Sequence, residues 1–294
     1  MKSTLLLLAA TNFITATLNG TTINEPAKYA WGTNVGWTNW RPSDTTGVVI
    51  GEFICSGYIY GANVGWIHLG SGFPINQIQY QNTGGDYGVN YTVDPQQPGY
   101  AVLRGFAYGA NIGWVQFETS GNPRLRFTDG ALEGYAYGAN VGWINLGDPS
   151  QHFLRTDHIV MGLDSDGDGI ADAFEYQFFG SLAPTNQTDS DGDGVNDLNE
   201  YLQGTHPLRA NEYLRVTAFS TNATGTNSPI TWTSTTARLY TIETSLDLSP
   251  LSWVTDTTFS YPIAPDPGSS TSRTLLAATA QKRFYRVRSI TPLP

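Results

Sequence analysis

The chain has 294 residues, which is long enough for two or three domains, and its glycine and aromatic content suits a folded protein with a sizeable core. It carries 25 Asp and Glu against 15 Lys and Arg, a formal net charge of −10. An anionic chain without a basic stripe is unsuited to nucleic acid, so we exclude that partner class.

Residues 1–20 are predicted to be a signal peptide. Lys2 precedes a short apolar run, Leu5–Ala10, that is too short to span a bilayer. A buried N-terminal strand is the alternative interpretation. No later segment is apolar for long enough to cross a membrane, so we expect a mature protein that is secreted, extracellular or held in the cell envelope.

Cys55 is the only cysteine, so the chain cannot form an internal disulfide bond. It ends the apolar run Val48–Cys55, which has the composition of a buried strand. We therefore expect an inert, buried thiol, and metal ions as the alternative means of stabilising a secreted chain.

Residues 21–160 contain an internal repeat, which predicts a domain of antiparallel hairpins. In each copy a turn of sequence Gly-x-Asn-x-Gly lies between an aromatic residue and a tryptophan. The four copies are Trp31–Trp37, Tyr60–Trp66, Tyr108–Trp114 and Tyr137–Trp143. Glycines that tolerate positive φ and an Asn suited to turns favour a β-hairpin in each copy, and aromatic and β-branched residues favour the flanking strands.

The repeated Trp and Tyr side chains have two possible uses. We expect Trp37, Trp66, Trp114 and Trp143 to form a shared core layer, because aromatic burial is the dominant use of such residues. The alternative is a carbohydrate-binding surface, in which rings stack on sugars while Asn amides bond hydroxyls. The repeats resemble the aromatic Gly-x-Asn-x-Gly-Trp repeats of large secreted bacterial surface proteins, a resemblance that implies no activity.

Residues 161–209 contain two 12-residue acidic loops that predict two calcium sites. Side-chain oxygens stand at positions 1, 3, 5, 9 and 12, a glycine stands at position 6, and the position-7 carbonyl completes the oxygen shell that Ca²⁺ needs. The predicted ligands are Asp164, Asp166, Asp168, Ile170 (carbonyl), Asp172 and Glu175 in the first loop, and Asp189, Asp191, Asp193, Val195 (carbonyl), Asp197 and Glu200 in the second. A solvated acidic turn is the alternative.

The flanks of these loops indicate which calcium family they resemble. Neither loop is preceded by a helical sequence, whereas residues 171–179 and 196–203 suit exiting helices. The aliphatic residue also stands at position 7 rather than position 8. The segment resembles thrombospondin type 3 repeats in the form common in secreted bacterial proteins, although the cysteines of the animal repeats are absent. The resemblance implies calcium-dependent structure without catalysis in extracellular or envelope proteins. We expect the loops to form a structural linker that holds the repeat domain away from the C-terminal module.

Residues 210–294 contain six short alternating runs separated by Asn, Gly, Pro and Ser turns, which predict a β-sandwich module. The whole chain is therefore expected to be mainly β. The four histidines are scattered and no catalytic motif is present, so we expect no enzyme. The sequence favours a secreted or cell-surface, non-catalytic calcium-binding protein with a structural, adhesive or scaffolding role. A surface glycan or a protein is a candidate partner besides calcium.

Overall fold

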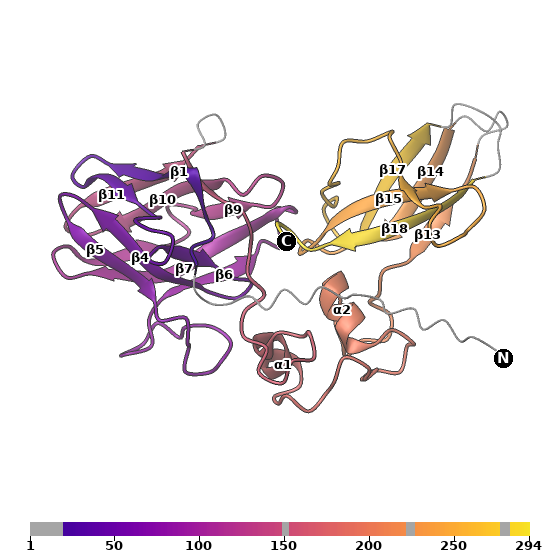
Figure 1. The fold of residues 1–294 in the computed structure, drawn as a ribbon, viewed down its shortest axis with the longest axis horizontal. Coiled ribbons are helices and arrows are strands. Elements are labelled where there is room, and N and C mark those ends of the chain that lie inside the picture. Colours follow the sequence, from indigo (N-terminus) through magenta and orange to yellow (C-terminus); the bar gives the residue numbers. More distant parts are fainter. Residues whose placement is uncertain (1–19, 149–152, 222–226, 277–282) are drawn as a thin grey trace, which may run out of the picture.

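The computed structural model describes residues 20–148, 153–221, 227–276 and 283–294. The predicted signal peptide lies outside this part of the chain, except for its last residue. The described residues are mainly β, as expected, with 18 strands and two short helices. Figure 1 shows a large β-structure formed by the first half of the chain, two smaller sheets formed by the last third, and the helices α1 and α2 below them.

The first half of the chain forms one 12-stranded sheet. Its strands are β1 (Ile23–Gly32), β2 (Gly36–Asn39), β3 (Val48–Ile50), β4 (Cys55–Gly61), β5 (Gly65–Gly70), β6 (Val89–Val93), β7 (Tyr100–Gly109), β8 (Gly113–Phe117), β9 (Arg124–Arg126), β10 (Leu132–Gly138), β11 (Gly142–Gly147) and β12 (Leu154–Thr156). Aromatic and β-branched residues, which favour strands, recur on both sides of the turns, for example Tyr58, Ile59 and Tyr60 in β4.

Eight of these strands close into a barrel. The order runs β11-β1-β2-β4-β5-β7-β8-β10, and β10 pairs in turn with β11. The four strand pairs β1–β2, β4–β5, β7–β8 and β10–β11 are each joined by one Gly-x-Asn-x-Gly turn. Neighbouring pairs meet in equivalent registers, namely Thr38↔Gly61, Ile67↔Gly109, Val115↔Gly138 and Ile144↔Gly32. The same contact is therefore made four times, and the fourth closes the ring.

The barrel interior is filled by alternate residues of the strands, as the two-residue period of a strand requires. Small or branched side chains point inward and are buried: Ala30, Thr38, Ile59, Ile67, Ala107, Val115, Ala136 and Ile144. Together with neighbouring residues, several of these line a residual cavity of only about 10 Å³. The barrel is therefore a packed core without a channel, as expected for eight strands.

Cys55 lies at the start of β4 and is fully buried. Burial raises the pKa of its thiol to about 12, which keeps the sulfur protonated and unreactive. The buried position expected for this thiol is confirmed.

The C-terminal part contains two three-stranded antiparallel sheets. One is made of β13 (Val216–Phe219), β14 (Asn227–Thr233) and β17 (Ser270–Leu276), and the other of β16 (Val254–Thr255), β15 (Leu239–Ser245) and β18 (Phe284–Ile290). Both sheets contribute to one apolar cluster that includes Trp232 from β14, Leu275 from β17 and Ile242 from β15.

The segment between the two β parts contains α1 (Asp172–Phe178) and α2 (Asp197–Gln203), which match the two exiting helices predicted. Their rings pack together, with Phe174 and Tyr201 5.0 Å apart between centroids. The Tyr201 hydroxyl donates to Glu52 of the barrel part, while Arg238 donates to the carbonyls of Tyr201 and Leu202. The helix α2 therefore joins both β parts.

This segment does not hold the flanking parts away from each other, contrary to the sequence expectation. Leu239 of β15 belongs to the apolar core of the barrel, and Ile290 and Leu293 pack against that core. The amide of Ile159 also donates to the carbonyl of Leu293 at 2.8 Å. Apolar residues near the C-terminus give the two β parts a direct contact that a linker interpretation did not foresee.

Candidate functional site

The first acidic loop is braced by its own carboxylates. One oxygen of Asp164 accepts the amide of Gly167 at 2.8 Å and the other accepts that of Gly169 at 3.0 Å. Asp168 accepts the amide of Ile170 at 2.8 Å through a single oxygen. Its second oxygen is buried and accepts no hydrogen bond from the described residues. The loop is thus folded around carboxylate oxygens, and at least one of them, on Asp168, accepts no hydrogen bond from the part of the chain that the structure describes.

The second loop repeats this geometry 25 residues later (189 − 164). Asp189 accepts the amides of Gly192 and Gly194 at 2.8 and 2.9 Å, and Asp193 accepts that of Val195 at 2.8 Å. Gly194 has φ 92°, close to the 91° of Gly169 in the first loop, a conformation that favours glycine. Two loops with the same internal bonds indicate the same use.

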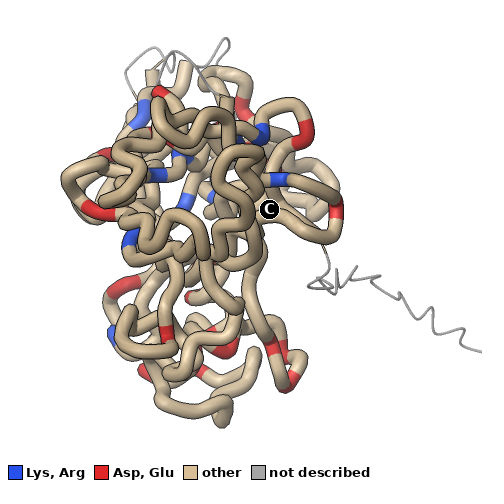
Figure 2. The backbone as a smooth tube through the Cα atoms, turned by 90° about the vertical axis from the view of Figure 1, so that its left-hand side faces the viewer, with Lys and Arg blue, Asp and Glu red and all other residues tan. Residues whose placement is uncertain are grey.

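Each loop gathers three carboxylates into a small space. In both triads the candidate ligand atoms lie within 4.8 Å of one another. The triads are Asp164, Asp166 and Asp168, and Asp189, Asp191 and Asp193. Acidic positions outnumber basic ones in the lower part of Figure 2, the height at which α1 and α2 lie in Figure 1. Acidic residues are therefore concentrated near the loops.

The position-12 glutamates supply the strongest indication of a ligand. Glu175 and Glu200 are both 0% exposed. Neither carboxylate oxygen of either residue accepts a hydrogen bond from any described residue. Burying a charged carboxylate without a partner is costly, because water no longer solvates it. Two such groups, each beside an aspartate triad, fit a bound cation as the compensating charge.

The pKa values of these groups show the electrostatic cost in the metal-free chain. Burial, together with repulsion from neighbouring aspartates, raises the pKa of Glu175 to about 7 and that of Glu200 to about 8. Burial also raises the pKa of Asp168 and of Asp197, with aspartate repulsion added. A divalent cation would remove this penalty by favouring the ionised forms.

The position-9 aspartates, also predicted as ligands, are engaged by a serine at position 2. The two oxygens of Asp172 accept the amide and hydroxyl of Ser165 at 2.7 and 2.6 Å. Asp197 accepts the same two donors from Ser190, at 3.1 and 2.7 Å. The position-9 aspartate therefore stabilises the loop through its hydrogen bonds to the serine. It would contact a bound cation through a water molecule, as often occurs in calcium loops.

The predicted carbonyl ligands belong to residues with different surroundings. The side chain of Ile170 is fully buried in the small apolar cluster with Phe174 and Tyr201, whereas Val195 is half-buried. Asn186 lies just before the second loop, and its side-chain amide donates to the carbonyl of Asp168 in the first loop at 2.9 Å. The two loops are therefore parts of one packed unit.

The asparagines of the four aromatic repeats form a closed ring of hydrogen bonds. Each Asn side chain donates to the backbone carbonyl that follows the Asn of a neighbouring turn. The four bonds run from Asn34 to Val141, from Asn63 to Val35, from Asn111 to Val64 and from Asn140 to Ile112, at 3.1–3.2 Å. The amide groups that the carbohydrate hypothesis assigned to ligand are thus used to hold the turns together.

The four repeat indoles lie on the outside of the barrel, and the prediction of a shared tryptophan core layer is wrong. Trp37, Trp66, Trp114 and Trp143 are 56%, 49%, 45% and 46% exposed. Each follows a turn glycine and precedes a buried residue, so strand alternation directs it outward. The interior of an eight-stranded barrel is just wide enough for side chains to fill it, and residues such as Ile59, Ile67 and Val115 already occupy it.

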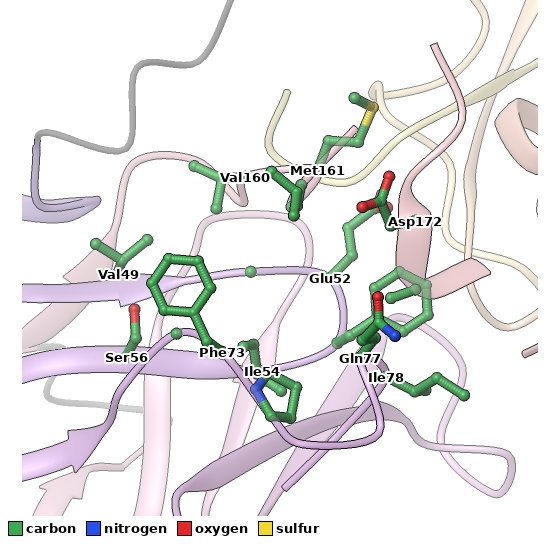
Figure 3. Close-up of a pocket in the computed structure, with 17 residues that line it drawn as sticks. Val49, Glu52, Ile54, Ser56, Phe73, Gln77, Ile78, Val160, Met161 and Asp172 are labelled. Carbon is green, nitrogen blue, oxygen red and sulfur yellow. The ribbon is translucent and has the colours of Figure 1, made fainter. Parts of the chain in front are cut away.

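A pocket of about 230 Å³ lies between the barrel part and the first loop. Figure 3 shows Phe73 and Ile54 among its lining residues, with Met161 near the segment that leads to the loop and Asp172 projecting from α1. The lining is mostly apolar, and the Asp172 carboxylate is already bonded to Ser165. A cation bound in the first loop would therefore also fix one wall of this pocket.

The sequence did not lead us to expect the serine-to-aspartate hydrogen bonds within each loop, or the ring of asparagine hydrogen bonds between the repeats. Ser at position 2 of both loops was a visible signal, because a hydroxyl and an amide there can both reach a carboxylate seven residues later. The four equivalent asparagines were also visible, but their partners lie in other repeats.

Comparison with family models, with curated proteins and with solved structures found no match to this chain. Among the described residues, no helix is both long enough and apolar enough to cross a lipid bilayer.

Proposed function

We propose that this is a secreted or cell-surface, non-catalytic protein that binds two calcium ions and uses them to stabilise its structure. The observation that carries the proposal is the pair of buried glutamates, Glu175 and Glu200, whose carboxylates accept no hydrogen bond from the described residues and stand at the twelfth position of acidic loops. Ca²⁺ suits such sites because it takes six to eight oxygen ligands, including a bidentate carboxylate. Mg²⁺ suits them less, because it retains water.

The position of the second loop supports a structural use for the ion. Glu200 is followed directly by Tyr201, whose hydroxyl bonds Glu52 and whose carbonyl accepts from Arg238. An ion that fixes Glu200 would therefore fix the α2 residues that join the two β parts. Each site with a Kd of ~0.1 mM would contribute roughly 1.4 kcal/mol at ~1 mM calcium.

We extend the proposal to the organisation of the chain. A signal peptide at residues 1–20 would direct a hairpin-repeat domain (21–160), tandem calcium loops (161–209) and a C-terminal β-sandwich module (210–294) to the outside of the cell. The shared apolar cluster of the two C-terminal sheets supports the sandwich interpretation. The likeness of the loops to thrombospondin type 3 repeats supports a structural, adhesive or scaffolding role over a signalling one.

The test is thermal unfolding of the full mature chain, after treatment with EDTA and again with calcium restored. Calcium is expected to raise the melting temperature and to protect residues 161–209 from proteolysis. Melting curves that coincide in EDTA and in excess calcium would exclude the proposed sites.

A further inference from the structure

We propose that a continuous aromatic patch on the outer wall of the barrel binds a neutral polysaccharide chain. The patch consists of Tyr58, Tyr60, Trp66, His68, Tyr87, Phe106, Tyr108 and Trp114. These residues belong to the strand pairs β4–β5 and β7–β8, with Tyr87 on the segment that connects them. No predicted calcium ligand belongs to the patch, so this inference goes beyond the proposed function.

The patch is continuous because the connection between the second and third repeats is longer than the others. Asn63 and Asn111 are 48 residues apart, against 29 between Asn34 and Asn63. The additional residues bring Tyr87 between the two strand pairs. Its ring meets His68 at 5.6 Å and Trp114 at 4.9 Å.

Ring contacts hold the indoles in fixed orientations. Tyr87 lies at 86° to the plane of Trp114, and Tyr58 lies at 85° to that of Trp66, at a centroid distance of 6.2 Å. Both indoles nevertheless remain almost half exposed. Aromatic side chains that are fixed by ring contacts at one edge, and still open to solvent, lose little conformational entropy when a ligand binds.

The chemistry of the patch matches an uncharged ligand with apolar faces and hydroxyl groups. Its residues are aromatic, and burial lowers the pKa of His68, which keeps that ring neutral at neutral pH. The face of an aromatic ring is electronegative and attracts the polarised C–H groups of a pyranose face. Tyr58, Tyr60 and Tyr108 are exposed and bring hydroxyls that can donate to or accept from sugar hydroxyls.

Other occupants fit the patch less well. Protein interfaces combine aromatic residues with Arg and Met, and neither type belongs to the patch. A membrane surface attracts Lys and Arg, which are also absent from these eight positions. A contiguous group of exposed aromatic side chains on a folded protein nevertheless suits a binding surface.

The experiment is native affinity electrophoresis of the full mature chain through gels that contain calcium and one soluble neutral polysaccharide. The panel is hydroxyethylcellulose, xylan, galactomannan and a β-1,3-glucan. Variants Trp66→Ala and Trp114→Ala remove the two indoles of the patch. Trp143→Ala is the matched control, because Trp143 has the same place in its repeat but contacts only Tyr135 and Tyr137 among the described ring pairs.

At least one polysaccharide is expected to retard the native chain. Each patch variant should weaken retardation about fivefold or more, as the loss of an anchoring side chain does, while Trp143→Ala retains it. Trp114→Phe should recover part of the binding. All variants should have melting temperatures close to that of Trp143→Ala. Absence of retardation across the panel, equal loss in Trp143→Ala, or binding to phosphatidylcholine vesicles with none to polysaccharide would overturn the proposal.

Discussion

The side-chain amide of Asn34 donates a 3.1 Å hydrogen bond to the backbone carbonyl of Val141, which lies 107 residues further along the chain. This bond joins the first repeat to the last. The same relationship links the other three neighbouring turns, so the ring of asparagines has no free end. The hydrogen bonds of the repeated Asn residues therefore follow the same closed path as the strands of the barrel.

Asn34→Ala should destabilise the barrel. Loss of one hydrogen bond and exposure of its acceptor costs about 1 kcal/mol, which corresponds to a fall of about 2–4 °C in melting temperature for a chain of this size. Thr33→Ala is the matched control, because Ala62, Ala110 and Ala139 occupy the equivalent place in the other turns. Equal melting temperatures for the two variants would show that the ring contributes nothing to stability.

Tyr201→Phe should weaken the junction between the two β parts. It removes the hydroxyl that donates to Glu52, a group whose pKa is raised by burial, and leaves this acid with one donor fewer, at a cost of about 1–3 kcal/mol. The change is measured by chemical denaturation in excess calcium. Tyr176→Phe on α1 is the control, since no hydrogen bond of its hydroxyl is described; a cost as large there would contradict the proposed role of Tyr201.

Stabilisation by calcium should increase with pH. The folded, metal-free chain holds protons on Glu175 and Glu200 up to about pH 7 and 8, whereas unfolded glutamate releases them near its ordinary value of 4.5. The metal-free chain therefore loses stability as the pH rises through this window, and calcium compensates for the loss.

The measurement is the rise in melting temperature on adding ~1 mM calcium to metal-depleted protein. The rise should be larger at about pH 8 than at about pH 5.5, because protons compete with the ion for the glutamates. A calcium effect of equal size at both pH values would contradict this account of the loops.

Ser165→Ala should weaken calcium binding without abolishing it. The variant loses the hydroxyl bond to Asp172 but keeps the backbone amide bond, so the first loop is less firmly braced. A loss of about 1 kcal/mol in binding free energy, or about fivefold in Kd, is expected for one hydrogen bond. Ser181→Ala, outside both loops, should bind as the native chain does; an unchanged Kd in Ser165→Ala would remove the bracing role.

Local features of the fold could be predicted from the sequence because they depend on nearby residues. Asp164 braces its loop through amides three and five residues away, and Gly204 ends α2 with φ 68°, both of which short-range rules anticipate. The inert environment of Cys55 followed from the apolar run that contains it.

Features that depend on the closed shape could not be predicted. Strand alternation allowed Trp66 to face either way, and the choice was made by the narrow barrel interior, which Ile59 and Ile67 already fill. The partner of Asn34 is set by closure, which no spacing within a single repeat specifies. Similarly, Leu239 joins the barrel core only because the C-terminal part folds back onto it.

The most direct test of the calcium sites is isothermal titration of calcium into the metal-depleted chain, with Glu175→Gln and Glu200→Gln as variants. Each substitution keeps the size of the side chain but removes its charge at the buried position. The native chain is expected to bind two ions, and each variant one, whereas the surface control Glu212→Gln should still bind two. Absence of binding to the native chain, or two ions bound by both loop variants with unchanged affinity, would contradict the assignment of calcium to these loops.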